Sequence, residues 1–150
     1  MTFLKTERMQ AAVFAALLLA FCGRVAAQLL QKFAPVAWLP GFEHWQSGLL
    51  PYAALVFFQA LIILGCVTFL LKIASGTLLR RPARGKILLI LGSVYFTGAV
   101  LRLALSQTGW LDSHFFKSPI AATFHVVLAL MVLIWSGFHR RTSAKDAAPA

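Results

Sequence analysis

The sequence predicts an all-α membrane protein, a four-transmembrane-helix bundle with short loops and a single domain over residues 1–150. Of its 150 residues, 60% are hydrophobic, which is more than ordinary soluble domains contain. Four apolar stretches reach the roughly 18–20 residues that a bilayer crossing needs. Basic residues also gather on one side of the alternating crossings, as in multi-pass membrane proteins.

The four predicted spans follow one another closely along the chain. They run about Met9–Leu30, Leu49–Leu71, Ile87–Ser106 and Ile120–Phe138, and residues 139–150 form a polar tail. The last three are nearly continuous runs of Leu, Ile, Val, Phe and Ala, which is the composition of membrane helices. Pro51 suits the first turn of the second helix, where a missing N–H donor costs nothing.

The first span has a second interpretation as a secretory signal peptide. Basic residues precede a short apolar core, Ala11–Cys22, and the small residues 25–27 form a possible cleavage site before Gln28. Apolar character nevertheless continues to Leu30, and Arg24 lies awkwardly between the core and the cleavage site. We therefore favour a retained helix; cleavage of residues 1–27 would leave three spans.

The net charge of +10 is distributed according to the positive-inside rule. Ten basic residues share one side of four crossings: Lys5, Arg8, Lys72, Arg80, Arg81, Arg84, Lys86, Arg140, Arg141 and Lys145. We therefore expect a bacterial inner (plasma) membrane protein with both termini in the cytoplasm. This distribution argues against nucleic acid as a partner. Binding of anionic lipid headgroups by residues 80–86 is an additional expectation.

Polar and small residues predict how the helices pack. Small residues recur at every seventh position of the last two spans: Gly85, Gly92, Ala99 and Ser106, then Ala122, Ala129 and Ser136. Such residues let membrane helices approach closely. Arg102 lies three positions after Ala99, and His125 lies three positions after Ala122. Because residues three apart share a helix face, we expect both side chains to face inward on neighbouring helices. Gln59, deep in the second span, is expected to hydrogen-bond to another helix.

Ionisable groups from three spans fall in one layer beneath the outer surface. Arg24, Arg102 and His125 lie roughly 6–9 Å from the outer ends of their helices. The four acids of the chain lie outside the spans, at Glu7, Glu43, Asp112 and Asp146. An unpartnered charge in lipid is costly, so groups outside the helices must stabilise the two arginines.

Three interpretations of this layer remain open from the sequence. The arginines could reach the lipid headgroups, pair with Glu43 or Asp112 from the outer loops, or form an anion site. For the last, we predict a ligand-binding set of Arg24, Gln28, Glu43, Arg102 and His125. Guanidinium groups suit carboxylate or phosphate, so an anionic lipid, a quinone or a carboxylate solute is the expected class of ligand.

The most economical function is therefore a small, non-catalytic binding or accessory protein with a protein partner or a homo-oligomeric state. A b-type haem protein would need facing histidines, and His125 is the one histidine well inside a span. A metal-dependent membrane enzyme has weak candidates in His44, Asp112 and His114, whose spacing matches no strong motif. A small transporter would have to oligomerise. The sequence does not indicate a particular cofactor or catalytic residues.

The two cysteines predict neither a redox motif nor a disulfide. The chain contains no Cys-x-x-Cys sequence. Cys22 falls in the outer half of the first span and Cys66 near the inner end of the second. We therefore expect their depths to differ by roughly 10 Å or more.

Overall fold

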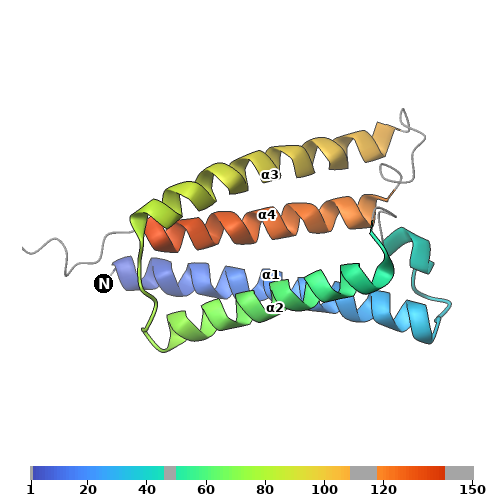
Figure 1. The fold of residues 1–150 in the computed structure, drawn as a ribbon, viewed down its shortest axis with the longest axis horizontal. Helices are drawn as coiled ribbons and strands as arrows, with labels where there is room; N and C mark the ends of the chain where they lie inside the picture. The colour runs from blue at the N-terminus through green and yellow to red at the C-terminus, as the bar shows by residue number, and fades with distance from the viewer. Residues whose placement is uncertain (1, 46–49, 109–117, 141–150) are drawn as a thin grey trace, which may run out of the picture.

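A computed structural model describes residues 2–45, 50–108 and 118–140 (Figure 1). It contains α1 (Thr2–Phe33), the 3₁₀-helix η1 (Phe42–Trp45), α2 (Tyr52–Ala74), α3 (Pro82–Thr108) and α4 (Pro119–Arg140), with no strand in the described ranges. Each α-helix is long and apolar enough to cross a membrane. The predicted all-helical fold with four such helices is confirmed.

The helices extend beyond the apolar spans that the sequence marks. α1 begins at Thr2 rather than near Met9, and α3 begins at Pro82 rather than near Ile87. Basic and polar residues continue these helices because helix formation does not require apolar side chains. Pro51 immediately precedes α2, where its missing N–H costs no hydrogen bond. Of the predicted polar tail, residues 141–150 lie outside the described residues.

Consecutive helices alternate in direction, so α1 begins and α4 ends at the same end of the molecule (Figure 1). We call this the N/C end and the opposite end, which carries η1, the η1 end. Across the molecule the order is α3, α4, α1, α2 (Figure 1). Although α2 and α3 are consecutive in the sequence, none of their Cα atoms lies within 8 Å of the other helix. A space between these two helices is left for side chains or a ligand.

The α3–α4 interface is the closest packing in the molecule and confirms the small-residue pattern. Gly85 and Gly92 are buried on α3, and Ala129 and Ser136 are buried on α4. The Ser136 hydroxyl donates a 2.7 Å hydrogen bond to the Gly85 carbonyl oxygen. A Cβ atom at Gly92 would lie 2.9 Å from a methyl carbon of Leu133, closer than packed atoms tolerate. Small side chains therefore permit this close approach of the backbones.

An aromatic core in the half nearer the N/C end joins three helices. The ring of Phe69 on α2 lies 5.0 Å from that of Phe14 on α1, between ring centroids. It also stacks on Trp135 at 4.6 Å and meets Phe138 edge-on at 5.6 Å, both on α4. Such ring pairs add about 0.5–1.5 kcal/mol each beyond their buried area. Phe69 is thus the main contact of α2 with α4.

The register of α1 against α2 corrects the expected separation of the two cysteines. Gln28 and Gln59 are hydrogen-bonded, and Phe14 meets Phe69, so Cys66 lies level with residues 17–21. Cys22 is then only about 2–8 Å away in depth, not 10 Å or more. The expected separation was wrong because α1 ends at Phe33 rather than Leu30 and α2 begins at Tyr52 rather than Leu49, so both outer ends are shifted by three residues. Both thiols are free.

We predict that the purified protein retains residues 1–27. This segment contributes Phe14, Leu18 and Phe21 to the buried interior, and α1 runs without interruption through the possible cleavage site. Removing it would expose the faces of α2 and α4 that pack on these side chains. The intact mass of the protein from its native membrane should match the full chain; a mass beginning at Gln28 would contradict the prediction.

Candidate ligand-binding cavity

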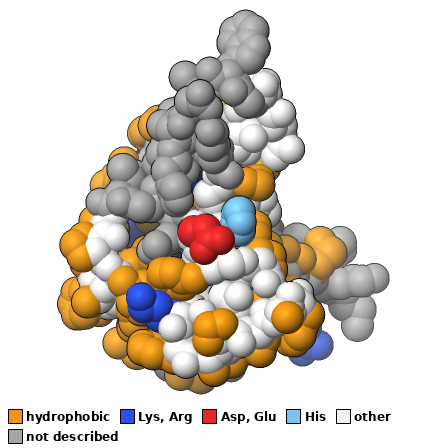
Figure 2. All heavy atoms as spheres, turned by 90° about the vertical axis from the view of Figure 1, so that its right-hand side faces the viewer, with side chains coloured by type: hydrophobic (Ala, Val, Ile, Leu, Met, Phe, Trp, Pro, Cys, Tyr) orange, Lys and Arg blue, Asp and Glu red, His pale blue; other side chains and the backbone are white. Residues whose placement is uncertain are grey.

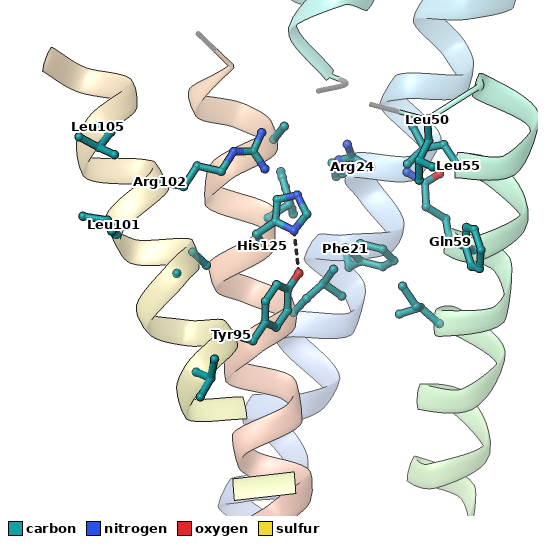
Figure 3. A pocket seen from close by; sticks show the side chains of 18 residues that line it. Phe21, Arg24, Leu50, Leu55, Gln59, Tyr95, Leu101, Arg102, Leu105 and His125 are labelled. Atoms are coloured by element: carbon teal, nitrogen blue, oxygen red, sulfur yellow. Dashed lines mark hydrogen bonds between the residues drawn. The ribbon is translucent and has the colours of Figure 1, made fainter. Parts of the chain in front are cut away.

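A cavity of about 920 Å³ lies between α2 and α3, with α1 and α4 behind it (Figure 3). Most of its lining is apolar; its polar and charged side chains are Arg24, Gln59, Tyr95, Arg102 and His125. Lining residues on both flanking helices are exposed, including Phe58 on α2 at 50% and Val94 on α3 at 70%. The cavity therefore opens sideways between α2 and α3.

Three predicted site residues, Arg24, Arg102 and His125, come together in this cavity. They lie at a similar level above Tyr95, and Arg102 extends from α3 toward α4, where its guanidinium group lies above the His125 ring (Figure 3). Both arginines are buried, with 8% of Arg24 and 7% of Arg102 exposed. The prediction that Arg102 and His125 face inward on neighbouring helices is confirmed.

Arg24 is stabilised by a backbone carbonyl and an aromatic ring. Its guanidinium Nη2 donates a hydrogen bond to the carbonyl oxygen of Trp45 in η1. The guanidinium carbon lies 5.6 Å from the ring centroid of Phe124 on α4, within cation–π range. Its Nε has no hydrogen-bond partner among the described residues. As expected, a group outside the four long helices stabilises the Arg24 charge, but this group is a backbone carbonyl and not a carboxylate.

His125 and Tyr95 form a hydrogen-bonded pair within the cavity. The Tyr95 hydroxyl oxygen and His125 Nδ1 are 2.6 Å apart, and the two rings meet edge to face at 6.0 Å between centroids. Tyr95 is not in the predicted ligand-binding set. Its position seven residues before Arg102 was the available signal, because residues seven apart lie on one helix face.

Gln28 supports the cavity from behind rather than lining it. Gln59 Nε2 donates a 3.0 Å hydrogen bond to Gln28 Oε1, and both side chains are almost fully buried. This confirms the interhelical hydrogen bond expected for Gln59. Among the described residues, Gln59 Oε1 and Gln28 Nε2 have no further partner. Gln59 therefore holds a buried acceptor next to the cavity.

Glu43 lies at the surface of the η1 end, away from the cavity. Its carboxylate is 3.6 Å from Nε2 of His44, and the two side chains are 62% and 56% exposed. Figure 2 shows the acidic and histidine side chains next to each other on this face. The structure thus does not bring Glu43 to Arg24. Asp112, the other acid expected as a possible partner, is outside the described residues.

The weak metal candidates are only partly described. No group of three or more His, Cys, Asp or Glu side chains comes together in residues 2–45, 50–108 and 118–140. Among the described metal-binding types of side chain, His44 lies near Glu43 only. Asp112 and His114 lie outside these ranges. The metal hypothesis therefore gains no support from the part of the chain that is seen.

η1 is anchored to two helices at the end of the cavity where Arg24 lies. The Ser118 hydroxyl donates a 2.7 Å hydrogen bond to the His44 carbonyl oxygen and accepts one at 3.3 Å from the Ala121 amide in α4. Trp45 is buried, with its indole N–H bonded to the Pro40 carbonyl at 2.9 Å. A tryptophan next to a span often belongs to the exposed aromatic belt of a membrane protein. The Trp45 side chain is buried instead, and its backbone carbonyl binds Arg24.

Comparison of this chain with protein-family models, with curated proteins and with solved structures gives no match in any of the three.

Proposed function

We propose that this chain is a multi-pass protein of a bacterial inner membrane, with the N/C end in the cytoplasm. Large apolar side chains cover the outward surface of the helices, among them Leu19, Phe57, Leu64, Ile90 and Leu101. Water would make such a surface unfavourable, whereas lipid would not. The basic residues of the connection between α2 and α3 lie at the N/C end, which matches the positive-inside rule.

We further propose that the protein binds an amphiphilic ligand in the cavity between α2 and α3. The observation that carries this proposal is the separation of polar and apolar surface within one sideways-opening cavity. Arg24, Arg102 and His125 lie together toward the η1 end, and Leu128 and Val94 belong to its apolar walls. A molecule with a polar head and a hydrocarbon body would satisfy both parts and could enter directly from the lipid.

The charge of the cavity favours a headgroup with anionic or carbonyl oxygens. Two arginines line it, and no carboxylate is among the described residues that line it. A guanidinium can donate paired hydrogen bonds to a carboxylate or a phosphate. Arg24 Nε is a buried donor that no described residue satisfies. An anionic lipid or fatty acid fits this arrangement best, and a quinone carbonyl shares part of the same chemistry.

The volume of the cavity is compatible with this class of ligand. Small-molecule sites typically enclose about 300–1,000 Å³, and this cavity, at about 920 Å³, falls near the upper limit. We propose a binding or accessory role because its polar groups are mainly donors that would hold a headgroup. A protein partner or a second copy covering the opening is the alternative occupant.

We expect Arg102→Leu to reduce the amount of ligand that copurifies with the protein by about tenfold or more, because a charge-assisted hydrogen bond in lipid is lost. The measurement is native mass spectrometry on protein extracted in mild detergent. Wild-type protein should carry a stoichiometric adduct whose mass names its chemical class. Arg102→Lys should retain an intermediate amount, because lysine keeps the charge but not the paired donors.

Lys86→Leu is the matched control, since Lys86 is an exposed cation on the same helix that lines no cavity. Its adduct should equal that of wild type. If Arg102→Leu retains the full adduct and only gains stability, Arg102 is a structural residue and the proposed site is wrong. A haem mass would instead support the redox alternative.

A further inference from the structure

A second cavity, of about 410 Å³, lies at the N/C end where α2, α3, α4 and the connection between α2 and α3 meet. Lys72 from α2, Arg81 from the connection and Arg84 from α3 line it. The half-buried Trp135, which stacks on the buried Phe69, supplies aromatic surface. Within residues 2–45, 50–108 and 118–140, the two cavities share no lining residue, so this one is separate from the proposed amphiphile site.

The three cations of this second cavity have no acidic partner within the described residues. Of the two carboxylates described, Glu7 accepts a 2.6 Å bond from Arg80, which does not line the cavity. Glu43 is at the opposite end of the molecule. All three cations are exposed, and positive charge clustered at an open hollow attracts anions. The cavity therefore has the electrostatics of an anion site.

His139 adds an independent observation, because two hydrogen-bond donors face its one imidazole ring. The backbone N–H of Arg81 is directed toward His139 Nδ1, with the two nitrogens 3.3 Å apart. The indole N–H of Trp135 is directed toward His139 Nε2, with the two nitrogens 3.2 Å apart. A neutral imidazole has one acceptor nitrogen and one donor nitrogen. It can therefore accept only one of these two bonds, and at least one donor is left over. His139 is 6% exposed, and both contacts with it are partly buried.

We propose that this cavity binds a phosphoryl anion, presented either by the headgroup of an anionic phospholipid or by free phosphate. Phosphate oxygens accept hydrogen bonds from arginine, lysine and amide donors, and they would take up the donor that His139 cannot satisfy. The half-buried Trp135 ring and the exposed Leu79 side chain offer apolar surface beside the cations. That surface would hold the glycerol and upper acyl chain of a lipid, as basic pockets between membrane helices do.

The test compares two double variants with the same loss of charge at the same end of the full-length protein. All four cations are exposed; Lys72→Gln/Arg84→Gln removes two that line the cavity, whereas Arg8→Gln/Lys86→Gln removes two that line neither cavity. Each protein is titrated with phosphatidylglycerol in mild detergent and analysed by native mass spectrometry. We expect the cavity variant to bind at least about tenfold more weakly than wild type, and the control to stay within about twofold.

Equal weakening in both double variants would show general charge attraction and would overturn the proposal, as would unchanged binding in the cavity variant. A competition arm then identifies the source of the anion. Displacement of the lipid by millimolar inorganic phosphate shows that the phosphoryl group is sufficient, and resistance to displacement shows that the lipid body is required. If the double variant fails to fold by circular dichroism, Arg84→Gln alone should weaken binding by about threefold or more.

The two cavities can be distinguished within the same experiments. Lys72 and Arg84 lie at the N/C end, and Arg102 lies toward the η1 end. Phosphatidylglycerol bound in the second cavity should therefore be insensitive to Arg102→Leu. Binding that disappears in Arg102→Leu and persists in Lys72→Gln/Arg84→Gln would place the lipid in the larger cavity and overturn the inference.

Discussion

Replacing Phe69 with alanine is expected to lower the free energy of unfolding by about 3–5 kcal/mol. Only 2% of Phe69 is exposed, and its ring contacts Phe14, Trp135 and Phe138. The substitution leaves a cavity and removes the aromatic contact of α2 with α4. Unfolding by titration with a denaturing detergent, followed by circular dichroism, measures the change.

Phe57→Ala is the matched control for this prediction. Phe57 lies on the same helix but is 59% exposed, and its ring contact is with its neighbour Phe58. Its loss should change stability by less than about 1 kcal/mol, because the side chain has no buried site to vacate. Equal destabilisation by the two variants would mean that Phe69 does not hold α2 in place.

Gly85→Val is expected to destabilise the protein by about 2–4 kcal/mol. A Cβ atom at Gly85 would lie 3.0 Å from the backbone nitrogen of Arg140 and 3.2 Å from the carbonyl carbon of His139. These are backbone atoms, so α4 itself must move. That movement also weakens the hydrogen bond from Ser136 to the Gly85 carbonyl. The same detergent titration reports the loss.

Gly137→Val separates this collision from the general effect of placing valine in a helix. Gly137 is on α4 one residue from Ser136, and a Cβ atom there would meet nothing within 4 Å. Both variants exchange glycine for valine, so their difference measures the α3–α4 contact. If Gly137→Val is as destabilised as Gly85→Val, close packing at Gly85 is not the cause.

The periodicity of small and polar residues predicted which face of each helix is packed against other helices. The recurrence of Gly85, Gly92 and Ala99 identified the packed face of α3, and the same repeat on each helix indicated that Arg102 and His125 face inward. The same reasoning found an interhelical role for Gln59. These features follow from the 3.6-residue repeat and from side-chain size, both of which can be read from the sequence.

The order of the helices and the partner of Arg24 could not be predicted in this way. A pattern on one helix does not say which neighbour it meets, so the open space between α2 and α3 was not foreseen. The bond from Arg24 to Trp45 uses a backbone carbonyl, and every residue offers that same group whatever its side chain. Glu43 was a candidate because carboxylates are visible in a sequence, whereas a carbonyl turned inward by η1 is not.

The central claim, that the cavity between α2 and α3 is occupied by an amphiphile, is tested most directly by filling the cavity without changing its charge. Gly98 lines the cavity on α3, and a Cβ atom there meets nothing within 4 Å. Gly98→Phe should therefore project a ring into the space without disturbing the packing. Gly23→Phe on α1 is the control, because Gly23 is equally unobstructed and lines neither cavity.

Native mass spectrometry of both variants, extracted in parallel with wild type, gives the decisive comparison. The proposed function predicts a stoichiometric amphiphile on wild type and Gly23→Phe, and its loss from Gly98→Phe while the protein remains folded. The same adduct on all three proteins, or none on folded wild type, would contradict a ligand in this cavity.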